Sequence, residues 1–285
     1  MADQLMQAPS RRDRVRAATS QEIVQTARRL LVEQGIAAVS LRAIAREMGM
    51  TAPALYRYYE SHEELLRHLV AEIFTELADY LHAEIRAAAR RFDLGAAPAA
   101  PKPGSGRASS RPTAGPGGGP GGAAAGPGSA GASDRLAVQL IAACRAFRSW
   151  ALEHQPEFGM IFGSPLPGLD IVHDDPLAEC GFRFGQVFLG LFSELWRKWP
   201  FPAPADDELD PTLRRQLASY QAQIGADLPL GVLQTFLRGW VLLYGTVSLD
   251  VFGHLRFALE DAAPLFELML TDLAAMIGLT YPLPG

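Results

Sequence analysis

The segment GMTAPALYRYY, Gly49–Tyr59, gathers side chains that can bind a phosphate or another anion. Three tyrosines and an arginine share its last four positions. Tyrosine hydroxyls donate hydrogen bonds, and a guanidinium adds a fixed positive charge and several donors. Packing of the same rings in a core is the alternative, and helical phase divides the segment between the two roles. Three residues are expected to face the protein: Leu55, Tyr58 and Tyr59. Tyr56 and Arg57 are expected to face outward.

Two longer helices are predicted on either side of this segment. Thr19–Glu22 fits a capping box that starts a helix ending at Gly35. Ser61–Glu64 fits a second capping box, which starts a long helix with an apolar residue at every fourth position. That apolar row consists of Leu65, Leu69, Ile73, Leu77, Leu81 and Ile85.

A pair of short helices is predicted between them. Ser40 is a suitable N-cap for a helix over Leu41–Met48, and Gly49 ends it. Thr51 can cap a third helix that tolerates Pro53 in its first turn. Two short helices joined by a glycine turn form a helix-turn-helix, whose second helix fits a DNA major groove about 12 Å wide. Bundles without DNA-binding activity contain similar pairs.

Charge favours the DNA-binding interpretation. The whole chain of 285 residues carries a net charge of −5, which argues against a protein that coats nucleic acid along its length. Residues 11–68, however, hold ten arginines and seven acidic residues, so this part is basic and the remainder is acidic. A basic module on an acidic body is suited to phosphate binding.

Residues 21–66, from QEIVQTARRLL through SLRAIA, the glycine turn and ALYRYY to SHEELL, resemble the N-terminal domain of TetR-type transcriptional repressors. About 50 residues match in order and spacing. The resemblance implies a homodimer in which a ligand-binding domain alters the separation of two DNA-binding domains. It also implies nine DNA-contacting residues in this chain: Ser40, Arg42, Thr51, Ala52, Pro53, Ala54, Tyr56, Arg57 and His62.

His62 departs from the pattern of the family, which often has lysine after the serine that caps the connecting helix. A neutral histidine can donate one hydrogen bond but lacks the fixed charge, so this contact is expected to be weaker and sensitive to pH. The second helix is also poor in amide and basic side chains. Recognition is therefore expected to rely on contacts with thymine methyl groups and on DNA shape.

The rest of the chain divides at a segment rich in glycine, proline and alanine. Residues 95–133 contain no aromatic or branched aliphatic side chain, so they are predicted to be a disordered insert. The predicted organisation is a flexible N-terminal arm over 1–18, a helix-turn-helix domain with its connecting helix over 19–94, the insert, and an all-helical ligand-binding and dimerisation domain over 134–285. Six helices are expected in that last domain: 134–154, 156–162, 176–199, 211–224, 230–253 and 262–277.

The C-terminal domain is less similar to the family. Residues 240–245 resemble a Trp-x-x-x-His-Gly signature of one TetR subgroup, with Tyr244 in place of the histidine. Seven aromatic residues are candidates for lining a ligand pocket, although core packing is the competing explanation: Trp150, Phe158, Phe162, Phe184, Phe188, Trp240 and Tyr244. The last two helices have wide apolar faces, and eight residues are candidates for a dimer interface: Leu233, Leu237, Val247, Leu265, Leu268, Met269, Leu273 and Met276.

Several classes of function are not supported. GxxxxGK[ST], GxSxG, HExxH and CxxC are all absent, and the match to GxGxxG at Gly117–Gly122 lies in the insert with no strand before it. No enzymatic activity, cofactor or metal site is therefore expected. The two cysteines, Cys144 and Cys180, are expected to be free thiols, and neither a signal peptide nor a membrane span is expected.

These patterns predict an all-α, cytoplasmic homodimer that binds a palindromic operator in double-stranded DNA. Repression is expected to end when a small, mostly hydrophobic effector binds. The alternative is a helical ligand-binding dimer that no longer binds DNA.

Overall fold

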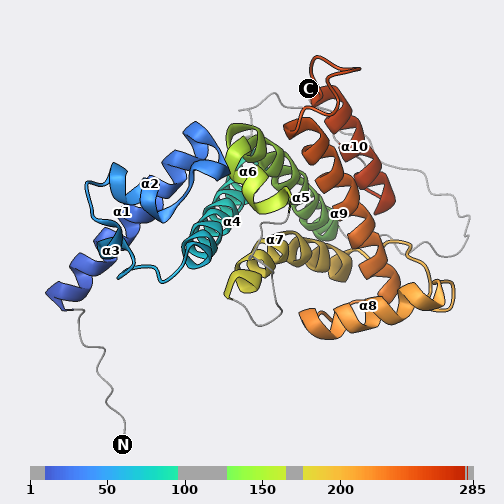
Figure 1. Cartoon of the computed structure of the whole chain (residues 1–285). Coiled ribbons are helices and arrows are strands. Elements are labelled where there is room, and N and C mark those ends of the chain that lie inside the picture. The colour runs from blue at the N-terminus through green and yellow to red at the C-terminus, as the bar shows by residue number, and fades with distance from the viewer. Residues whose placement is uncertain (1–9, 96–126, 165–175, 280, 282–285) are drawn as a thin grey trace, which may run out of the picture.

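The computed structural model describes residues 10–95, 127–164, 176–279 and 281, and within these ranges the chain forms ten α-helices, one short 3₁₀-helix and no strand. The prediction of an all-α fold is confirmed. Helices α1–α3 and the first turns of α4 form a small N-terminal unit, called the head below. The rest of α4 packs against α5, α6 and α7, and together with α8, α9 and α10 these helices form the body (Figure 1).

The head is built from short helices around α1 (Arg11–Gln34). After α1 come a 3₁₀-turn, η1 (Ile36–Ala38), and the two short helices α2 (Leu41–Glu47) and α3 (Ala52–Leu55). These two helices lie where the sequence predicted a helix-turn-helix.

The start of α1 differs from the prediction. Ser10 caps the helix: its hydroxyl accepts a hydrogen bond from the Asp13 amide at 3.2 Å, and the Asp13 carboxylate accepts one from the Ser10 amide. The prediction of a helix start at Thr19 was therefore wrong, and residues 11–18 are two further turns of α1 rather than part of a flexible arm. Residues 1–9 of the predicted arm lie outside the described residues.

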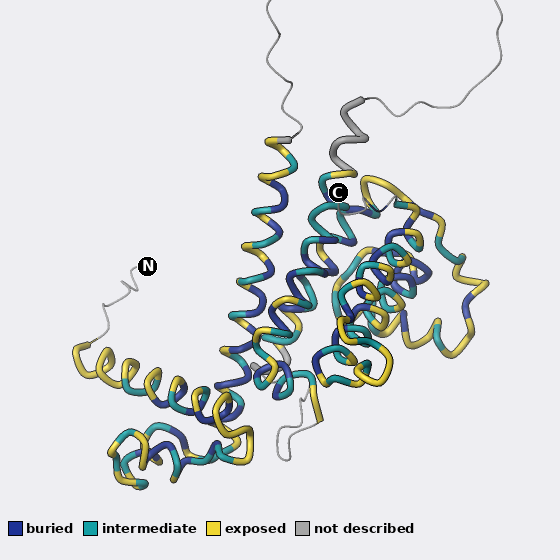
Figure 2. Tube along the Cα trace, turned by 90° about the horizontal axis from the view of Figure 1, so that it is seen from above, coloured by how far each residue is buried: buried dark blue, intermediate teal, exposed yellow. Residues whose placement is uncertain are grey.

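The helix α4 (His62–Gly95) belongs to both the head and the body. All six residues of its predicted apolar row are buried, and the first five are fully inaccessible to solvent. Their head-side members pack with α1 and α2, and their body-side members pack with α5 and α7, in one continuous hydrophobic core. Figure 2 shows this buried stripe along the helix.

The body consists of six helices. They are α5 (Pro127–Glu153), α6 (Gln155–Phe162), α7 (Pro176–Lys198), α8 (Pro211–Ile224), α9 (Leu230–Val251) and α10 (Ala263–Met276). The predicted bounds agree within two residues except at the start of α5. That helix begins at Pro127, so residues 127–133 do not belong to a disordered insert, and residues 96–126 lie outside the described residues.

A cluster of aromatic rings fills the centre of the body. The ring of Phe147 on α5 lies 5.6–6.1 Å from the rings of Phe158, Phe162, Phe184, Phe188 and Trp240, which come from α6, α7 and α9. Phe147 is completely buried. Four helices therefore meet around one side chain, at the separations typical of tilted and edge-to-face ring pairs.

The helix α9 is, among the described residues, the one that is long and apolar enough to cross a membrane by length and composition. Its inner face is buried in the body: Val232, Leu233 and Val247 are inaccessible to solvent. The same helix lies against α8 and α10. Packing within the protein therefore accounts for much of its apolar character.

Replacing Phe147 with alanine tests the role of this ring. The Phe147→Ala variant is expected to lose about 3–5 kcal/mol of unfolding free energy, because the cavity is surrounded by rings from three other helices and cannot collapse. Phe257 is 89% exposed, and Phe257→Ala is expected to change stability by less than about 0.5 kcal/mol. Denaturant unfolding of both variants measures the difference, and similar losses would contradict the assigned packing.

Candidate nucleic-acid interface and internal cavity

The α2–α3 pair is held together by its backbone and by one side-chain cap. Ser40 Oγ accepts a hydrogen bond from the Ala43 amide at 3.2 Å and so starts α2. At the other end, Gly49 has a φ of 64°, a left-handed conformation that glycine adopts without strain. The Met50 amide then donates to the Ala45 carbonyl at 2.8 Å, and Thr51 starts α3 without a side-chain cap.

The predicted DNA-contacting residues form the outer surface of this pair. Five are exposed: Arg42, Thr51, Pro53, Tyr56 and Arg57. Four are half-buried: Ser40, Ala52, Ala54 and His62. Leu55, by contrast, is completely buried, and Tyr56 beside it is 50% exposed. The helical phase expected from the sequence for these two positions is confirmed.

Tyr59 is an anchor for α3. Only 3% of the residue is exposed. Its hydroxyl lies 2.9 Å from Ser20 Oγ on α1 and 2.7 Å from His68 Nδ1 on α4. Burial raises the pKa of Tyr59, so the hydroxyl stays protonated and available for these hydrogen bonds. The anchor fixes the turn after α3 to both long helices of the head and leaves Tyr56 and Arg57 on the opposite side.

A second contact holds the same turn from α1. The Arg16 guanidinium donates to the Arg57 carbonyl at 3.1 Å and lies 5.7 Å from the centre of the Tyr58 ring. Tyr58 is half-buried, as expected from its phase. Sequence reasoning missed this role of Arg16, because the contact joins residues 41 positions apart and depends on the two extra turns of α1.

His62 has a structural partner in the head. Its Nε2 lies 2.7 Å from the carbonyl oxygen of Val39, and a protonated Nε2 can donate to that oxygen. The contact ties the start of α4 to the residue before the cap of α2. A phosphate contact by His62 would have to use the other ring nitrogen or replace this hydrogen bond.

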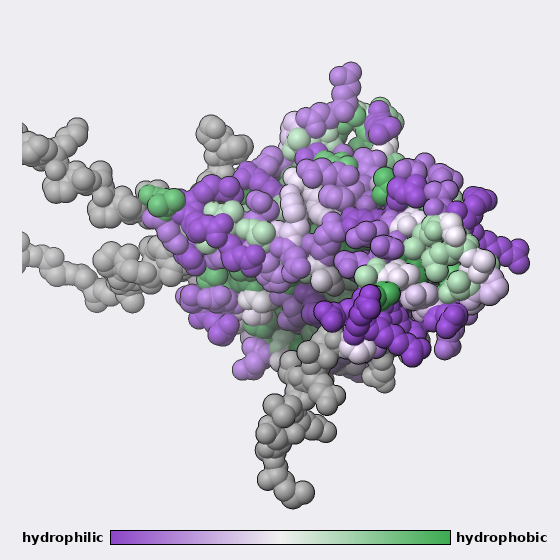
Figure 3. Space-filling model, turned by 90° about the vertical axis from the view of Figure 1, so that its left-hand side faces the viewer, coloured by the Kyte–Doolittle hydropathy of each residue, from purple (hydrophilic) through white to green (hydrophobic). Residues whose placement is uncertain are grey.

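Exposed arginines surround the α2–α3 surface. Arg11, Arg12 and Arg14 lie on the first turns of α1, and Arg42 and Arg46 lie on α2. Figure 3, which views the molecule from the side of the head, shows a largely hydrophilic surface. Two other arginines of the head are neutralised by neighbours: Arg29 pairs with Glu33 and Glu47, and Arg28 pairs with Glu76 and Glu157.

An apolar cavity of about 60 Å³ lies inside the body. Its walls come from α5, α7, α9, α10 and Leu279, and include Leu140, Ile141, Cys144, Phe188, Phe192, Phe236, Trp240, Leu243, Leu273 and Ile277. Among the described residues of the wall, Thr235 is the one with a hydroxyl group, and this hydroxyl donates to the Gly231 carbonyl. The cavity is smaller than the roughly 300–1,000 Å³ of ordinary ligand pockets, so a larger ligand has to widen it.

Two of the seven predicted pocket residues, Phe188 and Trp240, line this cavity. The other five do not: Trp150, Phe158, Phe162, Phe184 and Tyr244. They pack against one another or against neighbouring helices, as the competing core explanation requires. Tyr244, in the position of the family histidine, donates its hydroxyl to the Phe162 carbonyl at 2.7 Å and so caps the last turn of α6.

The eight predicted dimer-interface residues differ in their exposure to solvent. Leu233, Val247 and Met269 are buried within the body, so their side chains cannot contact a second copy. Leu237, Leu273 and Met276 are half-buried, while Leu265 and Leu268 are exposed. Three exposed apolar residues of α9 and its C-cap were missed, Leu242, Leu249 and Phe252, whereas Val241, also exposed, belongs to the apolar face that the sequence indicated for this helix. The sequence shows an apolar helix on nearly all sides, and periodicity alone does not indicate which side is inside.

Two family models match the chain. Residues 23–69 match the bacterial regulatory proteins of the tetR family, and residues 140–273 match the tetracyclin repressor-like C-terminal domain. The first match spans α2, the glycine turn and α3, and the second spans most of the body. Together the two models cover well over half of the chain.

Relatives along almost the whole length agree with these matches. The HTH-type transcriptional regulators Rv1816 of Mycobacterium tuberculosis and Mb1846 of Mycobacterium bovis are each 27% identical over 261 residues, which are 90% of this chain and 91% of theirs. The crystal structure of SCO4313 superposes with a TM-score of 0.61 at 26% identity, covering 94% of this chain and 100% of that chain. With a helix-turn-helix head, a helical body and matches to both domains, this chain belongs to the TetR family of DNA-binding transcriptional regulators.

Proposed function

We propose that this regulator is a repressor that binds a palindromic operator as a homodimer and leaves it when a small apolar effector binds. TetR regulators bind DNA and act as dimers. The observation that carries the proposal is the anchoring of Tyr59 between α1 and α4, which leaves Tyr56 and Arg57 exposed beside the tip of α3. A protein of this kind works on the chromosome, so we propose a cytoplasmic location.

The tip of α3 is suited to close approach to a major groove. Thr51, Ala52, Pro53 and Ala54 are small, and we propose that they reach the base edges while Tyr56, Arg57, Ser40 and Arg42 contact phosphates. Small apolar groups in the groove favour contacts with thymine methyl groups. Because such groups form few hydrogen bonds to base edges, we expect the shape of the DNA to contribute to sequence specificity. Two recognition helices about 34 Å apart would meet successive major grooves on one face of DNA.

We propose that the exposed apolar residues of α9 and α10 cover one another in the dimer. Val241 is 66% exposed, Leu268 is 58% exposed, and Leu249, Phe252 and Leu265 are each about 40% exposed. The two helices lie side by side in the body (Figure 1). An apolar surface of this kind on two adjacent helices is expected to pair with its own copy by two-fold symmetry, which makes a four-helix interface.

The walls of the internal cavity indicate the chemistry of the effector. The described residues of the wall include no charged side chain, and burial raises the pKa of the Cys144 thiol to about 12, so that this group stays a neutral thiol. Arg145, which follows Cys144 on α5, is paired with Glu267 at 2.8 and 3.0 Å. An effector that enters here is therefore expected to be mostly hydrocarbon. We propose that the body has two arrangements and that only one of them holds the heads at the spacing that fits DNA. An effector that binds the other arrangement more tightly would shift the protein toward it and release DNA.

A crystal of the effector complex would locate the ligand. Its electron density is expected beside the rings of Phe188 and Trp240, because these aromatic residues line the cavity. Density beside Trp150 or Phe158 instead would place the effector in a different part of the body and overturn this assignment.

Arg57→Gln tests the phosphate contacts. We measure binding to DNA from immediately upstream of the protein's own coding sequence at several salt concentrations. Affinity falls with salt, and each phosphate that the protein no longer neutralises makes the slope of log affinity against log salt less steep by about 0.9, so the change in both subunits of a dimer should make it less steep by about 1.8. Arg214→Gln, an exposed arginine of α8, should leave the slope unchanged. A flat salt response or a lack of sequence preference in the unaltered protein would favour a ligand-binding dimer that has lost DNA binding.

Leu268→Glu tests the dimer surface. A buried carboxylate at this position is expected to disfavour pairing, so light scattering on a sizing column should show a monomer that also binds the upstream DNA much more weakly. Val32→Glu is the matched control, because Val32 is 50% exposed on α1 of the head. If Leu268→Glu stays dimeric and Val32→Glu does too, the dimer uses another surface.

A further inference from the structure

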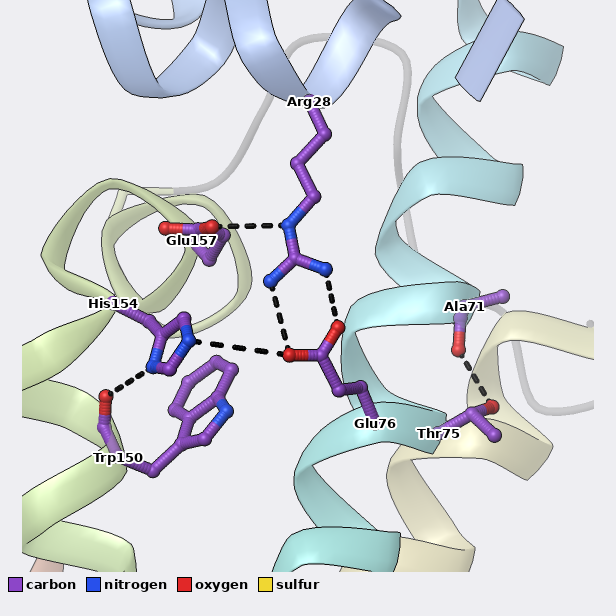
Figure 4. Close-up of polar contacts among 7 residues, drawn as sticks. All are labelled: Arg28, Ala71, Thr75, Glu76, Trp150, His154 and Glu157. Carbon is purple, nitrogen blue, oxygen red and sulfur yellow. Dashed lines mark hydrogen bonds and ion pairs between the residues drawn. The ribbon is translucent and has the colours of Figure 1, made fainter. Parts of the chain in front are cut away.

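Side chains from three helices meet where the head touches the body (Figure 4). Arg28 of α1 donates from Nε to Oε1 of Glu157 on α6 at 3.0 Å. Its two terminal nitrogens donate to the two carboxylate oxygens of Glu76 on α4, one of them at 3.1 Å. Because α1 belongs to the head and α6 to the body, this guanidinium joins the two units beside the continuous backbone of α4.

The geometry of this contact restricts orientation. A guanidinium is planar and its donors point in fixed directions, so two carboxylates bound at once define the plane in which α1 lies against α4 and α6. Glu157 is 3% exposed, and the loss of its cation would leave a buried carboxylate without compensation. The hydrogen bond from Arg28 also lowers the pKa of Glu76, with smaller contributions that include His154, so this carboxylate is charged near neutral pH.

Glu76 also faces a second set of donors, from the end of α5. His154 Nε2 lies 4.0 Å from its Oε1, and His154 stacks on Trp150 at a centroid distance of 4.8 Å. The indole N–H of Trp150 is buried and lies near enough to Glu76 to help lower the pKa of that carboxylate, but its geometry falls short of a hydrogen bond to any described residue. Unpaired buried donors are rare and costly, so a small movement of α5 that brings this N–H to Glu76 would be favourable.

The same helix forms a wall of the apolar cavity. Leu140, Ile141 and Cys144 of α5 line the cavity. Trp150 follows Cys144 by six residues on the same helix, which is about 9 Å along the helix axis. A ligand that widens the cavity has to displace at least one of the helices in its wall, and α5 is one of these helices. Displacement of α5 changes the position of Trp150 and His154 relative to Glu76.

We propose that Arg28 is the positioning residue of the head: its bonds to Glu76 and Glu157 hold the head at one angle to the body, and Trp150 and His154 replace it on Glu76 when α5 moves. The inference rests on the proposed function, since the head is the part that meets DNA. Arg28 itself faces the body and is not a DNA contact.

The distance between head and body tests this role without DNA or effector. Spin labels are attached at Gln21→Cys on α1 and Ser219→Cys on α8, both exposed, in a Cys180→Ser background. Cys144 is buried and needs no replacement. Labelled chains are mixed with an excess of unlabelled protein, so that each distance is measured within one chain. In the protein with Arg28 unaltered, the distribution of distances between the two labels is expected to show a single narrow peak.

Arg28→Gln is expected to abolish the single narrow peak and to give a broad or second population. Arg29→Gln is the matched control: the neighbouring arginine pairs with Glu33 and Glu47, which both belong to the head. The distance distribution of Arg29→Gln should equal that of the protein with both arginines unaltered. Arg28→Lys keeps the charge but cannot bind both carboxylates through a planar group, so an intermediate width is expected.

Far-UV circular dichroism separates positioning from a general loss of structure. Arg28→Gln should keep the helical signal of Arg29→Gln while the distance distribution changes. If Arg28→Gln does not fold, Glu76→Gln, at a half-exposed position, takes its place with the same expected broadening. A narrow, unshifted peak in the folded variant would overturn the proposal. Failure of operator binding in the unaltered protein would overturn the proposed function alone, because the distance measurement involves no DNA.

Discussion

The fold depends on the burial of one apolar row that runs along α4 from Leu65 to Ile85. The 34 residues of α4 span about 50 Å, and its apolar row is covered first by the head and then by the body. Because an α-helix has 3.6 residues per turn, a row that repeats every fourth residue drifts by about 40° at each step, so it winds around α4 from the part that the head covers to the part that the body covers. The head and the body therefore share a hydrophobic core and cannot separate. What they can do is change their angle about α4, since apolar contacts are not directional.

Direction is supplied by polar contacts around this core. Tyr59 and Arg16 fix α3 within the head, and they do so through a buried hydroxyl and a backbone carbonyl rather than through apolar area. Arg28 plays the corresponding part between the head and α6. The chain thus separates two tasks: burial provides stability, and a few hydrogen-bonded side chains determine the orientation of the surface that meets DNA. Of these contacts, the one at Arg28 lies beside Trp150 and His154 and is the one that a movement of α5 would alter.

Local patterns predicted the helices well and predicted contacts between distant residues poorly. The cap at Ser40 and the prolines and glycines at helix ends are signals within a few residues, and they located most helix bounds. The first turns of α1 were missed because Arg11–Arg16 is as polar as a disordered tail, and only the Ser10–Asp13 cap and the contact of Arg16 with Arg57 explain why it is helical. For α9 the sequence is apolar on most sides, so burial of Leu233 and exposure of Val241 could not be distinguished. Pocket and junction residues depend on which helices meet, and that information is tertiary.

We propose that the junction at Arg28 sets the spacing of the two DNA-binding heads in the dimer. The most direct test uses a DNA site selected by the unaltered protein from random sequences, with one base pair inserted or removed at its centre. Each change moves one half-site by about 3.4 Å and about 35°. The unaltered protein and Arg29→Gln should lose affinity on the order of tenfold or more, because a head can follow its half-site only by breaking the contacts of Arg28 with Glu76 and Glu157. Arg28→Gln should lose much less. Equal losses in all three proteins would contradict the account.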